Sequence, residues 1–173
     1  MTRVVLSIGS NLGDRLARLQ SVVDGLGEAV RAVSPVYETD PWGRLDQAPF
    51  LNAVLIADDA ACDAHAWLRR GQEFERAAGR VRGERWGPRS LDVDLIVCHG
   101  EAEVISRENT LTLPHPLAHL RAFVLIPWLA VDPDACLTVV EGPRPIAGLL
   151  AELEPADRHS VRLTDLTLTT RGS

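Results

Sequence analysis

The chain has 173 residues, of which 46% are hydrophobic and 24% charged, a composition that fits one globular domain with a single core. Its net charge of −6 at pH 7 argues against nucleic acid as the main partner, because proteins that bind the phosphate backbone usually present a basic face. The three cysteines are widely spaced and include no CxxC pair, so neither a disulfide framework nor a zinc site is suggested. We therefore expect a cytoplasmic protein.

The first part of the chain alternates strand and helix patterns. Residues 4–8 read as a short buried strand, and this run is too short for a signal sequence or a membrane span. The turn segment GSNLGD follows, and apolar residues then recur at helical spacing from Leu12 to Val30. The pattern next predicts a second strand, an irregular loop and a third strand, at residues 33–38, 39–49 and 50–57.

The next segment adds a helix and a strand. Asp63 is placed to cap a second helix that Gly79 could end, and residues 91–97 read as a fourth strand. This β-α-β-β-α-β order predicts an α+β, ferredoxin-like fold with an antiparallel sheet and helices on one face. The last third looks like an appendage with a strand pair and two helical stretches, near residues 104–113, 117–130 and 146–153. The final TTRGS is expected to fray.

Two aspartates stand inside the apolar fourth strand. Residues two apart on a strand point to the same face, so Asp92 and Asp94 project together while their apolar neighbours project into the core. Paired carboxylates without His or Cys at ligand spacing suit Mg²⁺, which takes other ligands from water and substrate phosphates, and two ions would fit between them. The alternative is a solvated edge, or ion pairs with Arg85 and Arg89.

Four arginines precede this strand in a segment that Gly83, Gly87 and Pro88 break into a loop. They are Arg80, Arg82, Arg85 and Arg89. Phosphoryl transfer requires such groups beside a magnesium site, because positive charge must meet the phosphate oxygens in the transition state. The planar guanidinium also grips two oxygens at once. Without the adjacent aspartates, a charged solvent loop would be the simpler interpretation.

Two further stretches could complete a site. LPHPLAHLRAF holds His115 between prolines, with Arg121 six residues later, and a purely structural histidine is the alternative. In YETDPWGRLDQAPFLN an irregular loop leads to Phe50 and Asn52, which share one face of the third strand. A stacking ring and an amide form a plausible slot for a flat heterocycle, whereas Phe50 and Trp42 as plain core residues is the equal alternative.

Together these motifs resemble one family, the 6-hydroxymethyl-7,8-dihydropterin pyrophosphokinases of folate biosynthesis. The matching segments are GSNLGDR, YETDPWG with FLN, GRVRGERWGPRSLDVDLI, and LPHP with RAFVLIP, which together reach from about residue 4 to 134. The resemblance implies a ferredoxin-like αβα fold with C-terminal additions and a single pyrophosphokinase domain over residues 1–173. It also implies an enzyme that moves the β,γ-diphosphate of ATP onto the 6-hydroxymethyl oxygen of the dihydropterin and releases AMP.

The resemblance assigns roles on the metal and phosphate side. Asp92 and Asp94 look like the ligands of two Mg²⁺ ions, and Arg80 and Arg89 look like the catalytic arginines. The expected ATP contacts are Arg82, Arg85, His115 and Arg121, with backbone near Leu95 and Thr112 facing the adenine. No His or Lys stands out as a general base, so the acceptor of the substrate's proton is left unassigned.

On the pterin side, Phe50 and Phe123 are similar to the two rings that sandwich the substrate. Asn52 would read the pyrimidine edge of the pterin. Backbone groups would add to this reading at Thr39, Asp40 and Trp42. Trp86 looks like an aromatic that closes over the substrates, and Glu75 like a supporting acid. We expect a monomer with small-molecule substrates and with no nucleic-acid or membrane partner.

Two other functions are left open. A metal-dependent phosphohydrolase or nucleotidyltransferase could use the same aspartates and arginines, and it would not bind a pterin. A ferredoxin-like binding module is the non-enzymatic alternative, and its RNA-binding form needs exposed aromatics in an RNP-type strand motif together with a basic surface. Neither feature is present in the sequence.

Overall fold

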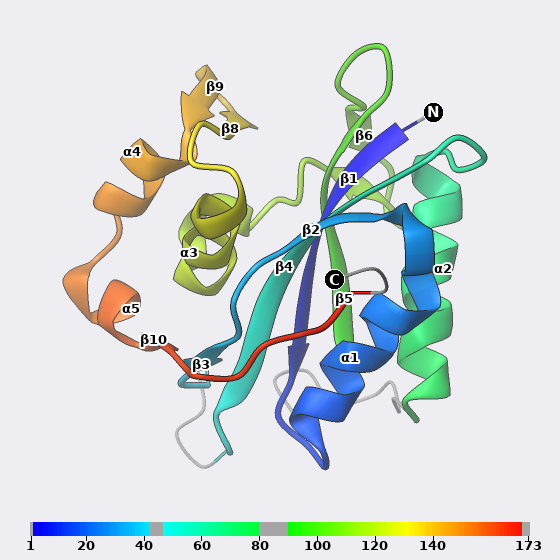
Figure 1. Cartoon of the computed structure of the whole chain (residues 1–173). Helices are drawn as coiled ribbons and strands as arrows, with labels where there is room; N and C mark the ends of the chain where they lie inside the picture. Colours follow the sequence, from blue (N-terminus) through cyan, green and yellow to red (C-terminus); the bar gives the residue numbers. More distant parts are fainter. Residues whose placement is uncertain (1, 42–46, 80–89, 171–173) are drawn as a thin grey trace.

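An antiparallel sheet runs through the middle of the molecule in a computed structural model that describes residues 2–41, 47–79 and 90–170 (Figure 1). Its six strands follow the order β10, β3, β4, β1, β5, with β2 also paired to β4. The strands are β1 (Thr2–Ser10), β2 (Val30–Val33), β3 (Tyr37–Thr39), β4 (Phe50–Asp59), β5 (Asp92–His99) and β10 (Val161–Leu163). Strand β1 is antiparallel to β4 on one side and to β5 on the other. The predicted ferredoxin-like core is therefore confirmed.

Two helices cover one face of the sheet, α1 (Arg15–Leu26) and α2 (Ala64–Ala77). Each begins at an aspartate whose carboxylate accepts a backbone N–H of the first turn, as the sequence predicted at Asp63. The first helix ends four residues before Val30, where the apolar spacing had placed its end. Gly27 stops it by adopting a φ of 56°, in the left-handed region that favours glycine.

The two helices approach each other closely at Gly25. A Cβ on this residue would lie 2.3 Å from Cε1 of Phe74 in α2, so only a hydrogen fits there. Beneath the helices lies the first core, whose fully buried members include Val4, Ile8, Leu19, Val22, Leu55, Trp67 and Leu91. The absence of a side chain at one helix position thus lets a phenylalanine of the other close this core.

The predicted second strand at residues 33–38 is instead two strands, β2 and β3, separated by Ser34–Val36. Pro35 has no N–H to give to a sheet ladder. Ser34 compensates, because its backbone N–H donates to the carbonyl of Val54 and its hydroxyl oxygen accepts the N–H of Val54, both at 2.9 Å. The interruption therefore leaves β4 paired on this side.

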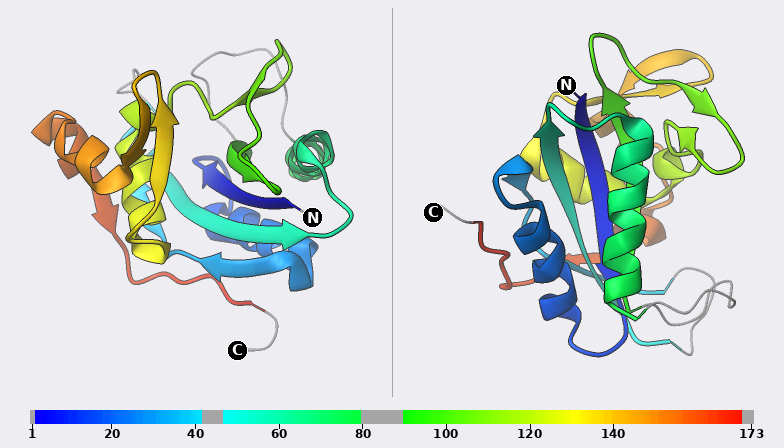
Figure 2. Two further views of the ribbon diagram at one scale, coloured as in Figure 1. Left: turned by 90° about the horizontal axis from the view of Figure 1, so that it is seen from above. Right: turned by 90° about the vertical axis from the view of Figure 1, so that its right-hand side faces the viewer.

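The last third of the chain covers the other face of the sheet, which confirms the αβα layers and the C-terminal additions that the resemblance implied. Helix α3 (Ala122–Val131) packs there, and a second core joins Val54 and Ile96 of the sheet to Val124 and Trp128. The layers are αβα, with α3 on the opposite side from α1 and α2 (Figure 2). The remaining elements are β6 (Ser106–Arg107), β7 (Thr112–Leu113), β8 (Cys136–Val139), β9 (Gly142–Pro145), α4 (Ile146–Ala151) and α5 (Pro155–His159).

The C-terminal segment returns to the main sheet, which the sequence did not reveal. Strand β10 pairs with β3, and the chain then runs alongside α1 with Leu166 and Leu168 packed on the first core. Thr169, which was expected to fray, donates its N–H to the side-chain oxygen of Gln20 at 3.0 Å and accepts from the amide nitrogen of the same residue.

No helix in the described ranges combines the length and the apolar character that crossing a bilayer requires.

Candidate active site

Three neighbouring strands bring polar residues into one row on the α3 face of the sheet. Asn52 of β4 pairs with Gly9 of β1, and Gly9 pairs on its other side with Asp92 of β5. Residues paired directly across antiparallel strands point to the same face. The amide predicted to read the pterin and a carboxylate predicted to bind metal therefore flank a residue without a side chain.

Gly9 keeps this row open. A Cβ at this position would lie 2.7 Å from Nδ2 of Asn52 and 3.5 Å from Cδ1 of Phe50, so any larger residue would displace the Asn52 amide while touching the ring. Sequence reasoning treated GSNLGD as a simple turn and missed this role. The signal was present, because a glycine inside a strand often marks a close approach.

The two aspartates lie as predicted. Asp92 and Asp94 are half-buried on one face at the start of β5, whereas Leu91, Val93 and Leu95 belong to the first core on the other face. Among the residues that the structure describes, no group of three or more His, Cys, Asp or Glu side chains gathers at ligand distance. A cation here would thus take its other ligands from water or substrate, as Mg²⁺ commonly does.

Helix α2 fixes the strand between these carboxylates. Glu75, only 6% exposed, accepts the backbone N–H of Val93 at 3.1 Å through its Oε2. One turn earlier, a Cβ on Gly71 would lie 3.2 Å from Val93, so the helix packs directly on the strand. The predicted supporting acid therefore acts on the backbone between the two aspartates.

Arg121 brings positive charge to the same place. Its Nη1 lies 3.7 Å from Oδ2 of Asp94, and its side chain is only 15% exposed. The guanidinium carbon stands 5.5 Å from the ring centre of Phe123, within the range of a cation–π contact. A largely desolvated cation beside a carboxylate is suited to bind phosphate oxygens.

His115 lies close to both charges and is held by the backbone. Its N–H donates to the carbonyl of Ile96 at 2.8 Å, and its Nδ1 accepts the N–H of Leu117 at 3.1 Å. Burial lowers the pKa of His115 below its usual 6.5; Asp94 opposes this shift and Arg121 adds to it. The imidazole is therefore neutral at pH 7, and Nε2 carries the proton that it can donate.

The residues predicted for the pterin gather beside Asn52. Thr39 pairs with Phe50 across β3 and β4, and Thr39, Asp40, Arg121 and Phe123 line one hollow. Two buried atoms in this region, Oδ1 of Asn52 and Oγ1 of Thr39, have no hydrogen-bond partner in the part of the chain that is described. Buried polar atoms are normally paired, so each of the two has hydrogen-bonding capacity that the described residues do not use.

Leu95 and Thr112, the residues whose backbone is predicted to face the adenine, lie in different surroundings. The side chain of Leu95 is buried in the first core, so this residue can offer only main-chain atoms. Thr112 lies on β7 and, with His115, lines a groove of about 1090 Å³. This groove runs between the β6–β7 and β8–β9 hairpins and has room for a nucleotide base and sugar.

Six predicted site residues lie outside the described residues. They are Trp42, Arg80, Arg82, Arg85, Trp86 and Arg89. Sequence reasoning also missed a group of charged residues that joins β3, β10 and the start of α1, namely Arg15, Glu38 and Arg162. No local pattern could have found it, because Arg162 meets Glu38 across strands that lie far apart in sequence.

Comparison with known proteins decides the family. A family model described as 7,8-dihydro-6-hydroxymethylpterin-pyrophosphokinase (HPPK) matches residues 5–133. The chain belongs to this family. The resemblance that the sequence motifs suggested to HPPK is therefore confirmed, and the matched segment contains every residue of the row Asn52, Gly9 and Asp92.

Relatives of the HPPK family resemble the chain over nearly its whole length. The 2-amino-4-hydroxy-6-hydroxymethyldihydropteridine pyrophosphokinase of Mycobacterium tuberculosis is 72% identical over 169 residues, which cover 94% of this chain and 90% of that protein. The protein of the same name from Mycobacterium leprae is 66% identical over 180 aligned positions, which cover 100% of this chain and 94% of that protein. A crystal structure of Plasmodium falciparum HPPK-DHPS superimposes with a TM-score of 0.61 at 12% identity, covering 87% of this chain and 45% of that one. At that identity the similarity shows the fold alone.

Proposed function

We propose that the chain catalyses the reaction of its family. It transfers the β,γ-diphosphate of ATP to the 6-hydroxymethyl group of 6-hydroxymethyl-7,8-dihydropterin, giving the pterin diphosphate and AMP, a step of folate biosynthesis. The observation that carries this proposal is the row of Asn52, Gly9 and Asp92 across three strands. It supports a site in which a heterocycle and a metal-bound phosphate chain lie next to each other.

The pterin would lie between Phe50 and Phe123, with its pyrimidine edge toward Asn52. The unpartnered Oδ1 of Asn52 is an acceptor for a ring N–H or amino group, and backbone groups of Thr39, Asp40 and Trp42 would complete the reading. A site that offers buried polar groups rejects ligands that leave them unpaired. This favours a pterin over a plain aromatic substrate.

Asp92 and Asp94 would hold two Mg²⁺ ions together with the phosphates of ATP. Two half-buried carboxylates on one face, beside a glycine and without a third His, Cys, Asp or Glu among the described residues, leave room for phosphate and water ligands. When bound, the metals would neutralise phosphate charge and lower the pKa of the attacking alcohol.

The chain's own residues position the reactants. The hydroxymethyl oxygen attacks the β-phosphorus in line, a new O–P bond forms, and the bond from the β-phosphorus to the oxygen of the α-phosphate breaks to release AMP. Arg121 would hold phosphate oxygens by charge, and neutral His115 would donate its Nε2–H to them. We assign Arg82 and Arg85 to ATP, Arg80 and Arg89 to the transferring group, and Trp86 to closure over the substrates.

We also propose that residues 1–173 act as one pyrophosphokinase domain, as a monomer in the cytoplasm. Support for one domain comes from β10, which joins the same sheet as β1. The three free cysteines suit a reducing compartment.

The test is AMP formation by the purified protein with ATP, Mg²⁺ and the hydroxymethyl dihydropterin. We expect AMP only when all three are present. Asp94→Asn should lower turnover by about 100-fold or more, because the carboxylate charge is lost while the side-chain shape is retained. The matched control is Asp134→Asn, at an exposed position after α3, which should retain full activity.

AMP or phosphate release without the pterin would favour the phosphohydrolase or nucleotidyltransferase instead. If Asp94→Asn turned over at the rate of the control, the aspartates would not be the metal ligands.

A further inference from the structure

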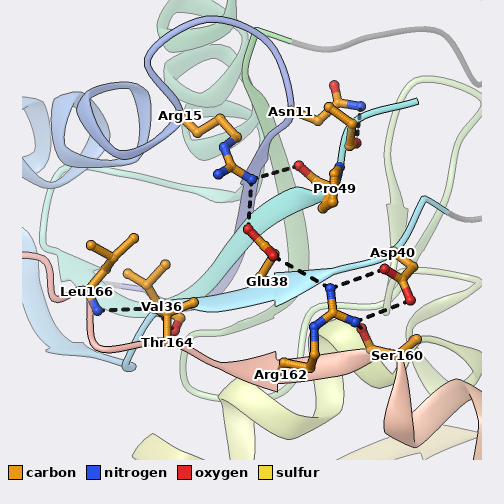
Figure 3. A network of polar contacts seen from close by, with 11 residues as sticks. Asn11, Arg15, Val36, Glu38, Asp40, Pro49, Ser160, Arg162, Thr164 and Leu166 are labelled. Carbon is orange, nitrogen blue, oxygen red and sulfur yellow. Dashed lines mark hydrogen bonds and ion pairs between the residues drawn. The ribbon is translucent and has the colours of Figure 1, made fainter. Parts of the chain in front are cut away.

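A chain of charged groups links Asp40, which directly follows β3, to Pro49, which directly precedes β4 (Figure 3). Arg162 of β10 binds both carboxylate oxygens of Asp40, at 3.1 and 3.2 Å. The backbone N–H of Asp40 also donates to the carbonyl of Ser160 at 3.3 Å. The residue whose backbone is predicted to face the pterin is thus held on two sides by the C-terminal segment.

The same arginine is linked to Pro49 through two further residues, Glu38 and Arg15. Its Nη2 lies 3.6 Å from Oε1 of Glu38, and the other oxygen of Glu38 lies 3.1 Å from Nη1 of Arg15. Arg15 in turn donates to the carbonyl of Pro49 at 2.9 Å. Asp40 and Pro49 are therefore linked by alternating charges, and Pro49 immediately precedes Phe50.

These ion pairs are too exposed to contribute much to the stability of the fold. The side chains of Arg162, Asp40 and Glu38 are 46%, 55% and 32% exposed, and pairs at such exposure add little to folding. Their geometry is nevertheless specific, because a bidentate arginine fixes both the distance and the orientation of its carboxylate. Groups that bind a substrate act only while they keep their positions, so a small displacement weakens the contacts that they make with it.

We propose that Arg162 is a positioning residue for the pterin: through Asp40, and through Glu38 and Arg15, it sets the backbone of Thr39 and Asp40 against Phe50 and Asn52. The proposal rests on the proposed function and extends it to a segment beyond the matched residues 5–133. It assigns to the C-terminal strand a part in substrate affinity, although no atom of that strand needs to touch the substrate.

Arg162→Ala tests this in the full-length protein. We expect the KM and the Kd for the dihydropterin to rise by about tenfold, while kcat and the KM for ATP stay within about twofold. Arg162→Lys should recover only part of the affinity, because an ammonium cannot bind both oxygens of Asp40 in one plane. The control is Arg31→Ala, which removes an arginine of similar exposure paired with Asp58 at the far end of β4.

A double-mutant cycle sharpens the test. Arg162→Ala and Asp40→Ala should each weaken pterin binding, and the double variant should be no weaker than the stronger single variant. Glu38→Gln provides a second entry to the network if Arg162→Ala fails to fold, and it should raise the pterin KM in the same selective way.

An unchanged pterin KM in these variants would overturn the proposal, and so would an equal loss of pterin and ATP binding. Failure of the proposed function looks different, because the unmodified protein would then form no pterin-dependent AMP.

Discussion

The buried amide of Asn52 lowers the stability of the folded protein when no ligand is bound. Its Oδ1 and the Oγ1 of Thr39 are buried without partners within the described residues, and an unsatisfied buried group typically costs about 1–3 kcal/mol. A ligand that donates to these atoms recovers this free energy on binding. The same two atoms therefore lower the stability of the free protein, and under the proposed function they would raise the affinity for a heterocycle that donates to them.

His115 should make the folded state sensitive to mild acid. Its folded pKa is lowered below 6.5, chiefly by burial, so below pH 6.5 the unfolded chain binds a proton more readily than the folded one. The unfolding free energy must then fall as the pH drops through this window, by at most about 1.4 kcal/mol per pH unit. His115→Asn keeps an acceptor for the N–H of Leu117 without titrating. We expect the wild type to lose more stability than this variant between pH 7.5 and 5.5 in urea unfolding, and parallel losses would contradict the assignment.

For single residues, the alternation of side chains along a strand predicted which residues share a face. Asp92 and Asp94 share a face because strand side chains alternate, and Phe50 and Asn52 follow the same rule. Arg162 could not be predicted, because its carboxylate partner Asp40 lies 122 positions away and the pairing exists only once β10 has joined β3.

Among the elements, the contact between α1 and α2 depends on Gly25. Gly25→Ala improves helix propensity by about 1 kcal/mol, but its Cβ would overlap Phe74 at 2.3 Å, and overpacking typically costs about 1–3 kcal/mol. We expect a net loss of stability, measured as a lower urea midpoint. Phe74→Leu in the same chain should restore part of it.

Gly148→Ala is the matched control, because its Cβ would meet nothing closer than 3.9 Å. That variant should be as stable as the wild type or slightly more stable. A Gly25→Ala variant as stable as the control would show that Phe74 can move aside without cost.

Element boundaries failed where backbone chemistry overrode the apolar pattern. The helical spacing continued to Val30, yet Gly27 ended α1 earlier by turning the chain. The apolar run at 33–38 suggested one strand, yet Pro35 divided it and the Ser34 hydroxyl took over a ladder position. In both places the type of element was predicted correctly and its extent was not.

Across the whole molecule, the C-terminal segment is part of the first core. From Thr164 to Thr170 partly buried and exposed residues alternate, so Leu166 and Leu168 face the same way, toward α1. The double variant Leu166→Ala/Leu168→Ala should lower the unfolding free energy by about 1–3 kcal/mol in urea unfolding. Leu163→Ala, at a site 67% exposed, is the control and should change stability little.

The sequence could have revealed this segment, since LTDLTLTT alternates leucine with polar residues as an extended chain on a surface does. The αβα layering followed from the resemblance and not from the residue pattern, because α3 is apolar on all sides and its pattern does not say which face of the sheet it covers. If the double variant were as stable as the control, the tail would be a passive covering.

The lateral edges of the sheet determine how easily copies of the protein could aggregate. Along β5, Glu75 accepts the N–H of Val93, and the backbone N–H groups of His115 and Val104 donate to the carbonyls of Ile96 and Cys98. The opposite side of the sheet ends in two short strands: β10, which is three residues long and carries the charged Arg162, and β2, which is four residues long and carries the charged Arg31. Exposed, unpaired strand edges are what other chains recruit when they aggregate. The sheet thus leaves little unpaired backbone at its lateral edges, so that crowding in a cell offers little opportunity for amyloid-like growth.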